Sequence, residues 1–398
     1  MGKEAVKVQD GPSKIWNPTF VSVFIAGCLM QMVVQMMSTI IPKYVNSMGA
    51  PATLVGFVAS AFTITALIFK IVSAPIIDAY DKKKILTVTL LIVTAAVAGY
   101  AVAGSVTTVI VARLLQGVGQ AFTVTCALTI ATNALPPDKL GVGLGIYSTS
   151  DAICRAFAPA LTLAISDRFS YTAVFLVAAG IMVVAMISAA SIRLKLPGTG
   201  HFRVSLSSVV AAEALIPALL MLLLHCAYYS LSSFLVIYAE TRRVSGIGYY
   251  FTIYALTMLV FRPLLGRLSD KFGGVRVMIP AFLCYALSFV IISVSASLPM
   301  FYLAAFISAI GYGASHPVVQ ALSMKSVPKE KRGAASCTNY IGQDLGNLAG
   351  GLTAGWLVQW FHYNYAAMWR MQLLPIGLCI LLVVVFRRRI AAIEATAK

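Results

Sequence analysis

Two carboxylates stand inside stretches of this chain that are otherwise apolar, and a carboxylate in such a place can carry a proton. Asp151 lies in the apolar stretch 141–166, and Asp344 lies in the stretch 333–360. An ionisable group at bilayer depth is costly, so it usually faces a cavity or a partner. Burial and nearby cations change how readily a carboxyl group ionises, which a proton carrier requires. We therefore expect both residues to take part in proton coupling.

The two carboxylates differ in their sequence neighbours. Tyr147, Asp151 and Arg155 are spaced i, i+4, i+8, which places them on one helical face. Two interpretations stay open: Asp151 and Arg155 neutralise each other, or Asp151 exchanges a proton. In the second interpretation Arg113 and Arg155 tune the carboxylate or hold an anionic substrate. Asp344 has no cation within a helical turn, so we expect it to be unpaired, with a hydrogen bond between helices as the alternative.

Polar and aromatic side chains recur at helical spacing in several apolar stretches and could line a substrate cavity. Amides and aromatic rings with methionine nearby suit an organic ligand that has polar and apolar parts. Packing between helices is the alternative for each stripe taken alone. The expected substrate-binding residues are Gln31, Gln35, Arg113, Arg155, His225, Tyr228, Tyr229, His316, Gln320, Tyr340 and Gln343.

These residues need a scaffold that spans a membrane, and the composition supplies one. Hydrophobic residues make up 60% of the chain and charged residues 11%, whereas a soluble domain is roughly a quarter charged. The apolar runs are continuous rather than alternating, which favours helices over a barrel. We predict an all-α membrane protein with twelve transmembrane helices. The expected spans are 18–42, 52–76, 84–104, 107–134, 141–166, 171–192, 211–238, 246–268, 276–297, 299–325, 333–360 and 365–386.

The net charge of +17 is a signal of topology rather than of a nucleic-acid surface. The cations lie in short segments between the apolar runs, with 21 on one side of the predicted membrane and 4 on the other. Because the cationic side faces the cytoplasm, we expect both termini there, in a plasma membrane such as a bacterial inner membrane. The seven cysteines lie inside apolar stretches without metal-ligand or disulfide spacing, so no metal site is expected.

One segment of the chain occurs twice. Residues 69–78 read FKIVSAPIID and residues 261–270 read FRPLLGRLSD, so Lys70 matches Arg262 at an offset of 192 residues. We expect both cations to snorkel toward the inner membrane surface, with anion binding at the inner mouth as the alternative.

This repeat divides the chain into halves. Two similar halves around a central site are a common plan of secondary transporters. The expected organisation is a six-helix bundle over 1–192, a cytoplasmic linker over 193–210 and a second, pseudo-symmetric six-helix bundle over 211–398.

Three stretches resemble signatures of the major facilitator superfamily. Residues 261–273, FRPLLGRLSDKFG, resemble its loop signature, and residues 113–121, RLLQGVGQA, resemble its signature of an arginine followed by glycines. Ala158-Pro159 stands where proton-coupled exporters of that superfamily carry a glycine-proline motif. The resemblance implies the twelve-helix fold, with the first, fourth, seventh and tenth helices around the pathway.

The loop signature also implies a latch that holds the two halves together in the outward-open form. A carboxylate at the end of a helix can accept hydrogen bonds from loop cations and from a neighbouring helix N-terminus. The N-terminal copy departs from the family pattern, since Lys82 stands in place of arginine. The latch residues that the resemblance implies are Asp78, Lys82, Gly266, Arg267 and Asp270.

Together these features predict a secondary active transporter that exports a small organic molecule, drug-like or a metabolite, by proton antiport. No phosphate-binding GxxxxGK[ST] motif occurs, so the proton gradient is the expected energy source and no cofactor is expected. An organic-anion exchanger or uniporter of the same fold is the alternative, motivated by Lys70, Arg113 and Arg155. The sequence offers no convincing catalytic set, so we expect no enzyme. The expected partners are the small-molecule substrate and the lipid bilayer, and a two-half transporter can act as a monomer.

Overall fold

The computed structural model describes residues 14–136, 139–192, 210–328 and 331–396, and within these ranges it is helical, with no strand. The predicted linker, 193–210, therefore lies almost entirely outside the described residues. The helices of the first half are α1 (Pro18–Ser47), α2 (Ala52–Ala79), α3 (Lys82–Ala101), α4 (Val106–Asn133), α5 (Leu140–Arg168) and α6 (Tyr171–Ala190). Those of the second half are η3 (Ala212–Ala214), α7 (Leu215–Thr241), α8 (Gly248–Phe272), α9 (Gly274–Val294), α10 (Leu298–Lys325), α11 (Arg332–Trp360), α12 (Tyr365–Met371), α13 (Leu373–Val385) and α14 (Arg387–Thr396).

Short polar residues begin several of these helices. The side chain of Asn17 accepts a hydrogen bond from the backbone N–H of Phe20 at 2.9 Å, and Pro18 follows it at the first helical position. Ser105 and Thr108 form a reciprocal cap at the start of α4. Such caps satisfy amides that have no partner within the helix. They explain why the observed helices begin within a few residues of the predicted spans.

Nine spans in the described part of the chain are long and apolar enough to cross a membrane. The long helices that fall outside this group are α5, α8 and α11, of 29, 25 and 29 residues. These three helices carry Arg155, Arg262 and Asp344, ionisable residues that the sequence marks as functional. The chain is an all-α membrane protein.

The last predicted span, 365–386, is interrupted in the structure. It consists of α12 and α13, and the break falls at Gln372. Pro375 lacks an amide hydrogen and cannot bond to the carbonyl of Met371, which explains a break in the helical ladder there. Helix α14 follows directly and was not predicted.

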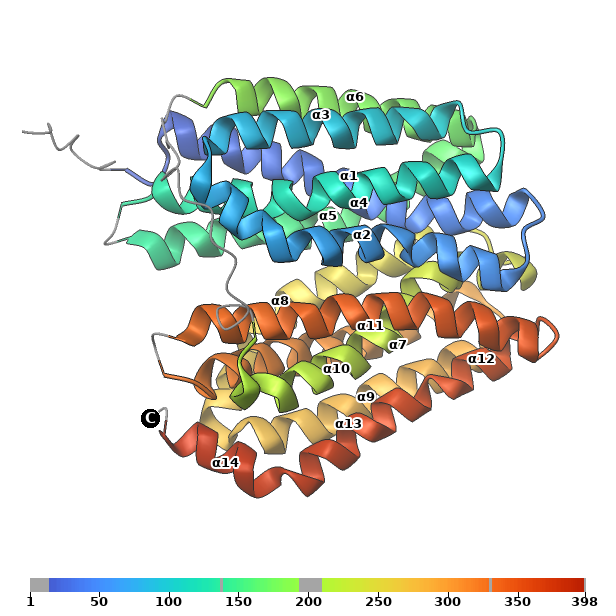
Figure 1. Cartoon of the computed structure of the whole chain (residues 1–398). Helices are drawn as coiled ribbons and strands as arrows, with labels where there is room; N and C mark the ends of the chain where they lie inside the picture. The colour runs from blue at the N-terminus through green and yellow to red at the C-terminus, as the bar shows by residue number, and fades with distance from the viewer. Residues whose placement is uncertain (1–13, 137–138, 193–209, 329–330, 397–398) are drawn as a thin grey trace, which may run out of the picture.

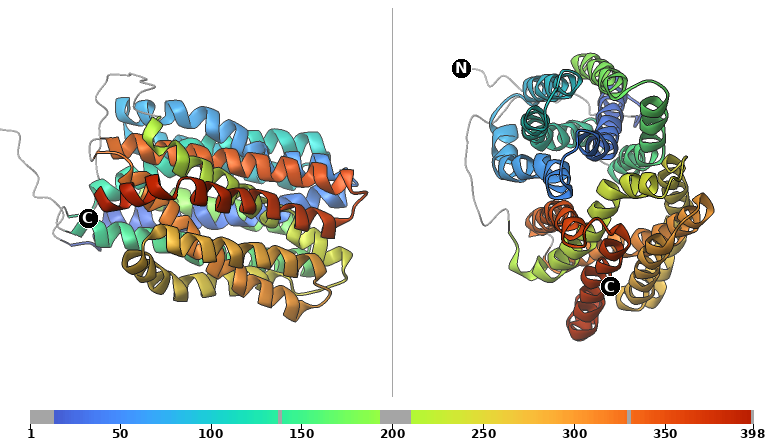
Figure 2. Two further views of the ribbon diagram at one scale, coloured as in Figure 1. Left: turned by 90° about the horizontal axis from the view of Figure 1, so that it is seen from below. Right: turned by 90° about the vertical axis from the view of Figure 1, so that its right-hand side faces the viewer.

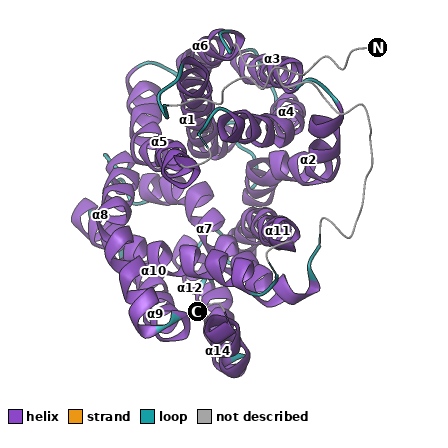
Figure 3. Ribbon diagram, turned by 90° about the vertical axis from the view of Figure 1, so that its left-hand side faces the viewer, coloured by secondary structure: helices purple, strands orange, loops and turns teal. Residues whose placement is uncertain are grey.

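The helices run along a common axis in two groups (Figure 1). Helices α1 to α6 lie together, and α7 to α14 lie together beside them, as the end-on views also show (Figures 2 and 3). The groups meet mainly where α2 packs on α11, α5 on α8 and α1 on α7. We call the end where α6 ends and α7 begins the linker end, and the end where α1 finishes at Ser47 the distal end.

Glycine allows the closest of these approaches. A side chain added at Gly56 of α2 would collide with the backbone carbonyl of Gly351 on α11. The same holds at Gly346, which lies against the carbonyl of Leu222 on α7. Small residues let membrane helices pack backbone to backbone. The Gly56–Gly351 contact joins the two groups on the distal side of the bundle.

Candidate functional site

A cavity of about 390 Å³ lies between the two groups of helices. From the first group it is lined by Gly27, Met30, Gln31, Val124, Leu128, Tyr147 and Arg155. From the second group it is lined by Tyr228, Tyr254, Met258, Arg262, Tyr312, Gly313, His316, Pro317, Gln320, Tyr340 and Gln343. The contributions of α1, α4, α10 and α11 all come from the halves of those helices that are nearer the linker end. The cavity therefore extends from mid-bundle toward the linker end.

Seven of the eleven expected substrate-binding residues line this cavity. They are Gln31, Arg155, Tyr228, His316, Gln320, Tyr340 and Gln343. Gln35 lies in a much smaller space of about 10 Å³, which also borders Arg155, Tyr228 and Tyr254.

Arg113 is not among the cavity-lining residues; it lies inside the first group of helices. Its side chain is 1% exposed, and its guanidinium donates to the carbonyl oxygens of Val58 at 3.3 Å and Ala59 at 2.7 Å. It also donates to Gln116 Oε1 at 3.2 Å and stands 4.6 Å from the centre of the Phe62 ring. These contacts satisfy hydrogen-bond donors of the buried guanidinium, and those to Val58 and Ala59 join α4 to α2.

His225 and Tyr229 are also absent from the cavity lining, and both are buried. The Tyr229 hydroxyl donates to the carbonyl of Ala59 at 2.6 Å, across the two groups. The His225 ring is 2% exposed, with Nε2 3.0 Å from the Tyr312 hydroxyl and Nδ1 3.1 Å from the Met221 carbonyl oxygen. These contacts fix the His225 and Tyr229 side chains in buried positions that are not part of the cavity lining.

A cluster of aromatic rings forms one wall of the cavity. Tyr228 and Tyr312 are stacked with ring centres 4.8 Å apart, and Tyr254 lies 6.5 and 6.3 Å from them. His316 stacks on Tyr312 at 5.2 Å. Arg155 reaches this wall from the other group, donating to the Tyr228 hydroxyl at 2.7 Å.

Tyr254, Met258 and Tyr312 line the cavity although they were not among the expected site residues. Arg262, for which we expect either snorkelling to the inner membrane surface or anion binding at the inner mouth, is an exposed residue that also lines the cavity. Tyr254, Met258 and Arg262 are spaced i, i+4, i+8, the same signal that marks Tyr147 and Arg155 on α5. The same spacing on α8 was not interpreted as a cavity face, because Arg262 was assigned to the loop signature.

Asp344 is paired, contrary to the expectation that it has no partner. The Lys70 ammonium of α2 lies 2.6 Å from Asp344 Oδ2 of α11 and 5.6 Å from the centre of the Tyr340 ring. The side chains of Lys70 and Asp344 are 36% and 14% exposed. Lys70 therefore does not snorkel to the surface, because a carboxylate of the other group offers a stronger partner at that depth. The ion pair joins the two groups beside the cavity-lining residue Gln343.

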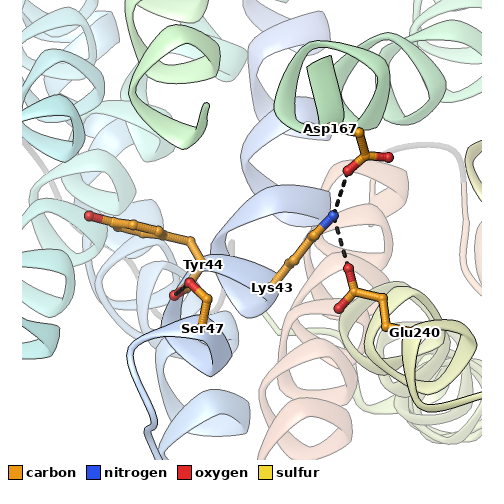
Figure 4. Close-up of polar contacts among 5 residues, drawn as sticks. All are labelled: Lys43, Tyr44, Ser47, Asp167 and Glu240. Carbon is orange, nitrogen blue, oxygen red and sulfur yellow. Dashed lines mark hydrogen bonds and ion pairs between the residues drawn. The ribbon is translucent and has the colours of Figure 1, made fainter. Parts of the chain in front are cut away.

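The distal end is closed by a second set of ion pairs (Figure 4). Lys43 of α1, only 9% exposed, places its ammonium 2.8 Å from Asp167 of α5 and 2.9 Å from Glu240 of α7. The contact with Asp167 stays within the first group, whereas the contact with Glu240 crosses to the second. At the same end, Thr53 of α2 donates to Gln359 of α11 at 3.0 Å.

Several predicted residues cannot be placed in the site. The side chains of Asp78, Asp151 and Asp270 lie outside the described part of the structure. Of the other latch residues, Arg267 is exposed, Lys82 begins α3, and no atom would lie within 4 Å of a side chain added at Gly266. The latch stays a prediction. Among the described residues, no three His, Cys, Asp or Glu side chains gather in a way that could hold a metal ion.

Comparison with known proteins gives consistent matches. A family model described as the Major Facilitator Superfamily matches residues 23–246 and 217–397. The chain is 25% identical over 363 residues to a multi-drug resistance efflux pump, PmrA, of Streptococcus pneumoniae, covering 83% of this chain and 87% of that one. It is 29% identical over 124 residues to a class H tetracycline resistance protein of Pasteurella multocida, covering 29% of this chain and 31% of that one.

Solved structures give the same fold. A crystal structure of the nucleoside transporter NupG superimposes with a TM-score of 0.79 at 12% identity, covering 93% of this chain and 99% of that one.

Proposed function

The chain belongs to the Major Facilitator Superfamily and is therefore a multi-pass membrane transporter rather than an enzyme, and on this premise we propose that it exports a small organic molecule by proton antiport through alternating access. The observation that carries the proposal is the cavity between the two groups, which extends toward the linker end while ion pairs close the distal end. In this arrangement a ligand reaches the site from one side only. The relative named as a multi-drug efflux pump supports the direction of transport.

The site would work from the cytoplasmic side. The asymmetry of cations across the membrane supports a linker end that faces the cytoplasm, and the proposed location is a plasma membrane. The cavity then takes its ligand from the cytoplasm. Breaking the Lys43–Glu240 contact and separating α2 from α11 at Gly56 and Gly351 would open the distal end and release the ligand outside.

The Lys70–Asp344 ion pair is the coupling element in this proposal. In the form described above, in which the cavity opens toward the linker end (the linker-open form), the Asp344 carboxylate is ionised and holds the Lys70 ammonium at 2.6 Å. When a proton from outside binds to Asp344 in the distal-open form, the carboxylate loses its charge and its hold on Lys70. Return to the linker-open form rebuilds the pair and releases the proton to the cytoplasm. Asp151 remains a second candidate carrier.

Reconstituted vesicles test the proposal. Purified protein is placed in liposomes that contain a fluorescent pH indicator, and a panel of organic compounds is added. We expect proton movement that depends on a transported compound. Asp344→Asn abolishes this movement but keeps exchange of the compound down its own gradient. The control Glu213→Gln, which loses an exposed contact of 3.6 Å with Lys331, keeps both activities. Substrate-linked proton movement that persists in Asp344→Asn rules out the coupling role.

One observation favours the alternative, an organic-anion exchanger or uniporter. Two guanidinium groups, Arg155 and Arg262, line the cavity. An exchanger would show counterflow of an organic anion that is undiminished when the proton gradient is collapsed. Counterflow of that kind, with no proton movement, would replace antiport by exchange.

A further inference from the structure

We propose that a pocket at the linker end, apart from the transport cavity, binds the headgroup of an anionic phospholipid, with its phosphate among Arg276, Arg387 and Arg388. The pocket has a volume of about 410 Å³ and lies between the start of α9 and the start of α14, where these three arginines line it. None of its lining residues lines the cavity between the two groups of helices. The inference therefore goes beyond the proposed transport function. We call this space the arginine pocket.

The three guanidinium groups of the arginine pocket come from two helices that pack on each other. Arg276 lies in the first turn of α9, whereas Arg387 and Arg388 begin α14. Figure 3 shows α14 beside α9 at the linker end, and Ile390 of α14 is 0% exposed, which fixes where α14 presents its arginines. All three arginines are exposed, and within the described part of the chain none of them forms an ion pair or a side-chain hydrogen bond. Their donors are therefore available to a ligand.

The charge of the arginine pocket stays positive whichever way the nearby carboxylates point. The helices around the pocket, α8, α9, α10, α13 and α14, contain two acidic residues, Asp270 and Glu394, whose side chains lie outside the described residues. The segment 326–332, which follows α10, has one acidic residue and three basic ones. Even if Asp270 and Glu394 both faced the pocket, its three arginines would outnumber them, and Lys271 and Arg389 adjoin the lining residues in sequence. The start of α14 adds the positive end of its helix dipole.

The position of the arginine pocket favours a lipid over a soluble anion. Helix α9 and the segment formed by α12 and α13 are both long and apolar enough to cross a membrane, and the pocket lies where both reach the linker end. Basic pockets between helices at this depth are suited to lipid headgroups. Phe272, 48% exposed, and Val275 form an apolar part of the lining, and Val385 at the end of α13 is 63% exposed. These side chains can contact acyl chains while the arginines hold the phosphate.

The arginines also select the kind of headgroup. A guanidinium presents its N–H donors in a planar fork that matches phosphate geometry. A zwitterionic headgroup also contains a phosphate, but it brings a cation that the three guanidinium groups would repel. Each basic residue near an anionic membrane surface strengthens binding about fivefold. We therefore expect the arginine pocket to prefer phosphatidylglycerol over phosphatidylcholine by at least about tenfold.

Local fluorescence quenching tests this preference. The full chain without its seven native cysteines carries a bimane label on Ala392→Cys, an exposed position of α14 next to the lining residue Ala391. It is placed in phosphatidylcholine nanodiscs that contain increasing fractions of phosphatidylglycerol or phosphatidylcholine with a nitroxide close to the headgroup. We expect the labelled phosphatidylglycerol to give half-maximal quenching at a mole fraction at least about tenfold lower. A bimane on Val102→Cys at the distal end should show no preference. Equal quenching by the two lipids at Ala392→Cys overturns the proposal.

Variants then separate a site from a diffuse surface charge. The triple variant Arg276→Gln/Arg387→Gln/Arg388→Gln should lose the preference, whereas lysine at the same three positions should keep part of it. A control of equal charge loss changes three exposed lysines of the first group at the same end: Lys14→Gln, Lys84→Gln and Lys139→Gln. Equal loss of the preference in the arginine variant and in this control contradicts the pocket.

A competition experiment distinguishes a lipid from free phosphate. Millimolar inorganic phosphate should reduce the quenching by nitroxide-labelled phosphatidylglycerol no more than sodium chloride of the same ionic strength does. Displacement of the lipid by phosphate but not by chloride would mean that the arginine pocket takes free phosphate, and the lipid assignment would be wrong. Neither transport nor a gradient enters these measurements, so a failure of proton-coupled transport in vesicles would leave their result intact.

Discussion

Removing the Glu240 carboxylate should open the distal end, whereas removing the Asp167 carboxylate should not. Both side chains contact the same Lys43 ammonium, at 2.9 and 2.8 Å, but only the contact with Glu240 joins the two groups. Glu240→Gln therefore weakens closure of the distal end, and Asp167→Asn is its matched control.

The size of the effect follows from burial. The Lys43 side chain is 10% exposed and that of Glu240 is 44% exposed, so the contact is intermediate between an exposed pair, worth about 0–1 kcal/mol, and a buried pair, which costs about 3–5 kcal/mol to break. Lys43 keeps Asp167 when Glu240 is lost, so no buried charge is left alone. We expect a shift of about 1 kcal/mol toward the distal-open form, a change of about fivefold in its population.

Distances between spin labels measure this population. Exposed positions at the distal end are Val102, after α3, and Ala296, before α10, one in each group. With labels there in a background that lacks the seven native cysteines, Glu240→Gln should raise the fraction of long distances about fivefold. Asp167→Asn should leave it near the parent value. Equal shifts in the two variants, or no shift in either, would refute the assignment of Glu240 as the cross-group contact.

Three further outcomes follow from the same geometry. Lys70→Met should abolish transport against a gradient, whereas the double variant Lys70→Asp/Asp344→Lys, which exchanges the two charges, should retain part of that transport. Full transport by Lys70→Met together with no transport by the double variant would show that the ion pair has no role. Gly351→Leu should hold the distal end open in the spin-label assay, because the added side chain would collide with Ser60 and the Gly56 carbonyl of α2. The control Gly377→Ala, with no atom within 4 Å of the added carbon, should behave like the parent protein. A closed distal end in Gly351→Leu would contradict the close packing of α2 on α11. Arg113→Met should lower the thermal unfolding temperature, since hydrogen bonds to a buried charged donor are worth about 1.5–3 kcal/mol, and should leave the apparent KM of a transported compound unchanged. A raised KM without lost stability would place Arg113 in the site instead.

The helices could be predicted well from the sequence because each depends on local features. Continuous apolar runs and capping residues such as Asn17 and Ser105 fix where helices begin, and the lipid requires every backbone amide to be satisfied within the helix. The interruption at Pro375 is also a local signal, although the apolar run around it hid the break.

Pairings between helices could not be predicted in the same way. Lys70 and Asp344 are 274 residues apart, and Lys43 and Glu240 come from different groups, so no spacing rule connects them. The partners of Arg113 could not be predicted for a different reason. They are backbone carbonyl groups of α2, which every residue type carries, so the sequence does not single them out. Residues that share one helical face, such as Tyr312, His316 and Gln320, are the part of the site that periodicity can find.

Locking the distal end chemically tests most directly whether the cavity is reached alternately from the two sides. Lys43→Cys/Glu240→Cys is joined by a short, reducible bis-thiosulfonate cross-linker, and transport is measured before cross-linking, after it and after reduction. Alternating access predicts that transport stops on cross-linking and returns on reduction, while a cysteine at Gln343 stays open to a membrane-impermeant maleimide from the linker side throughout. Transport that continues with the distal end locked would contradict the account.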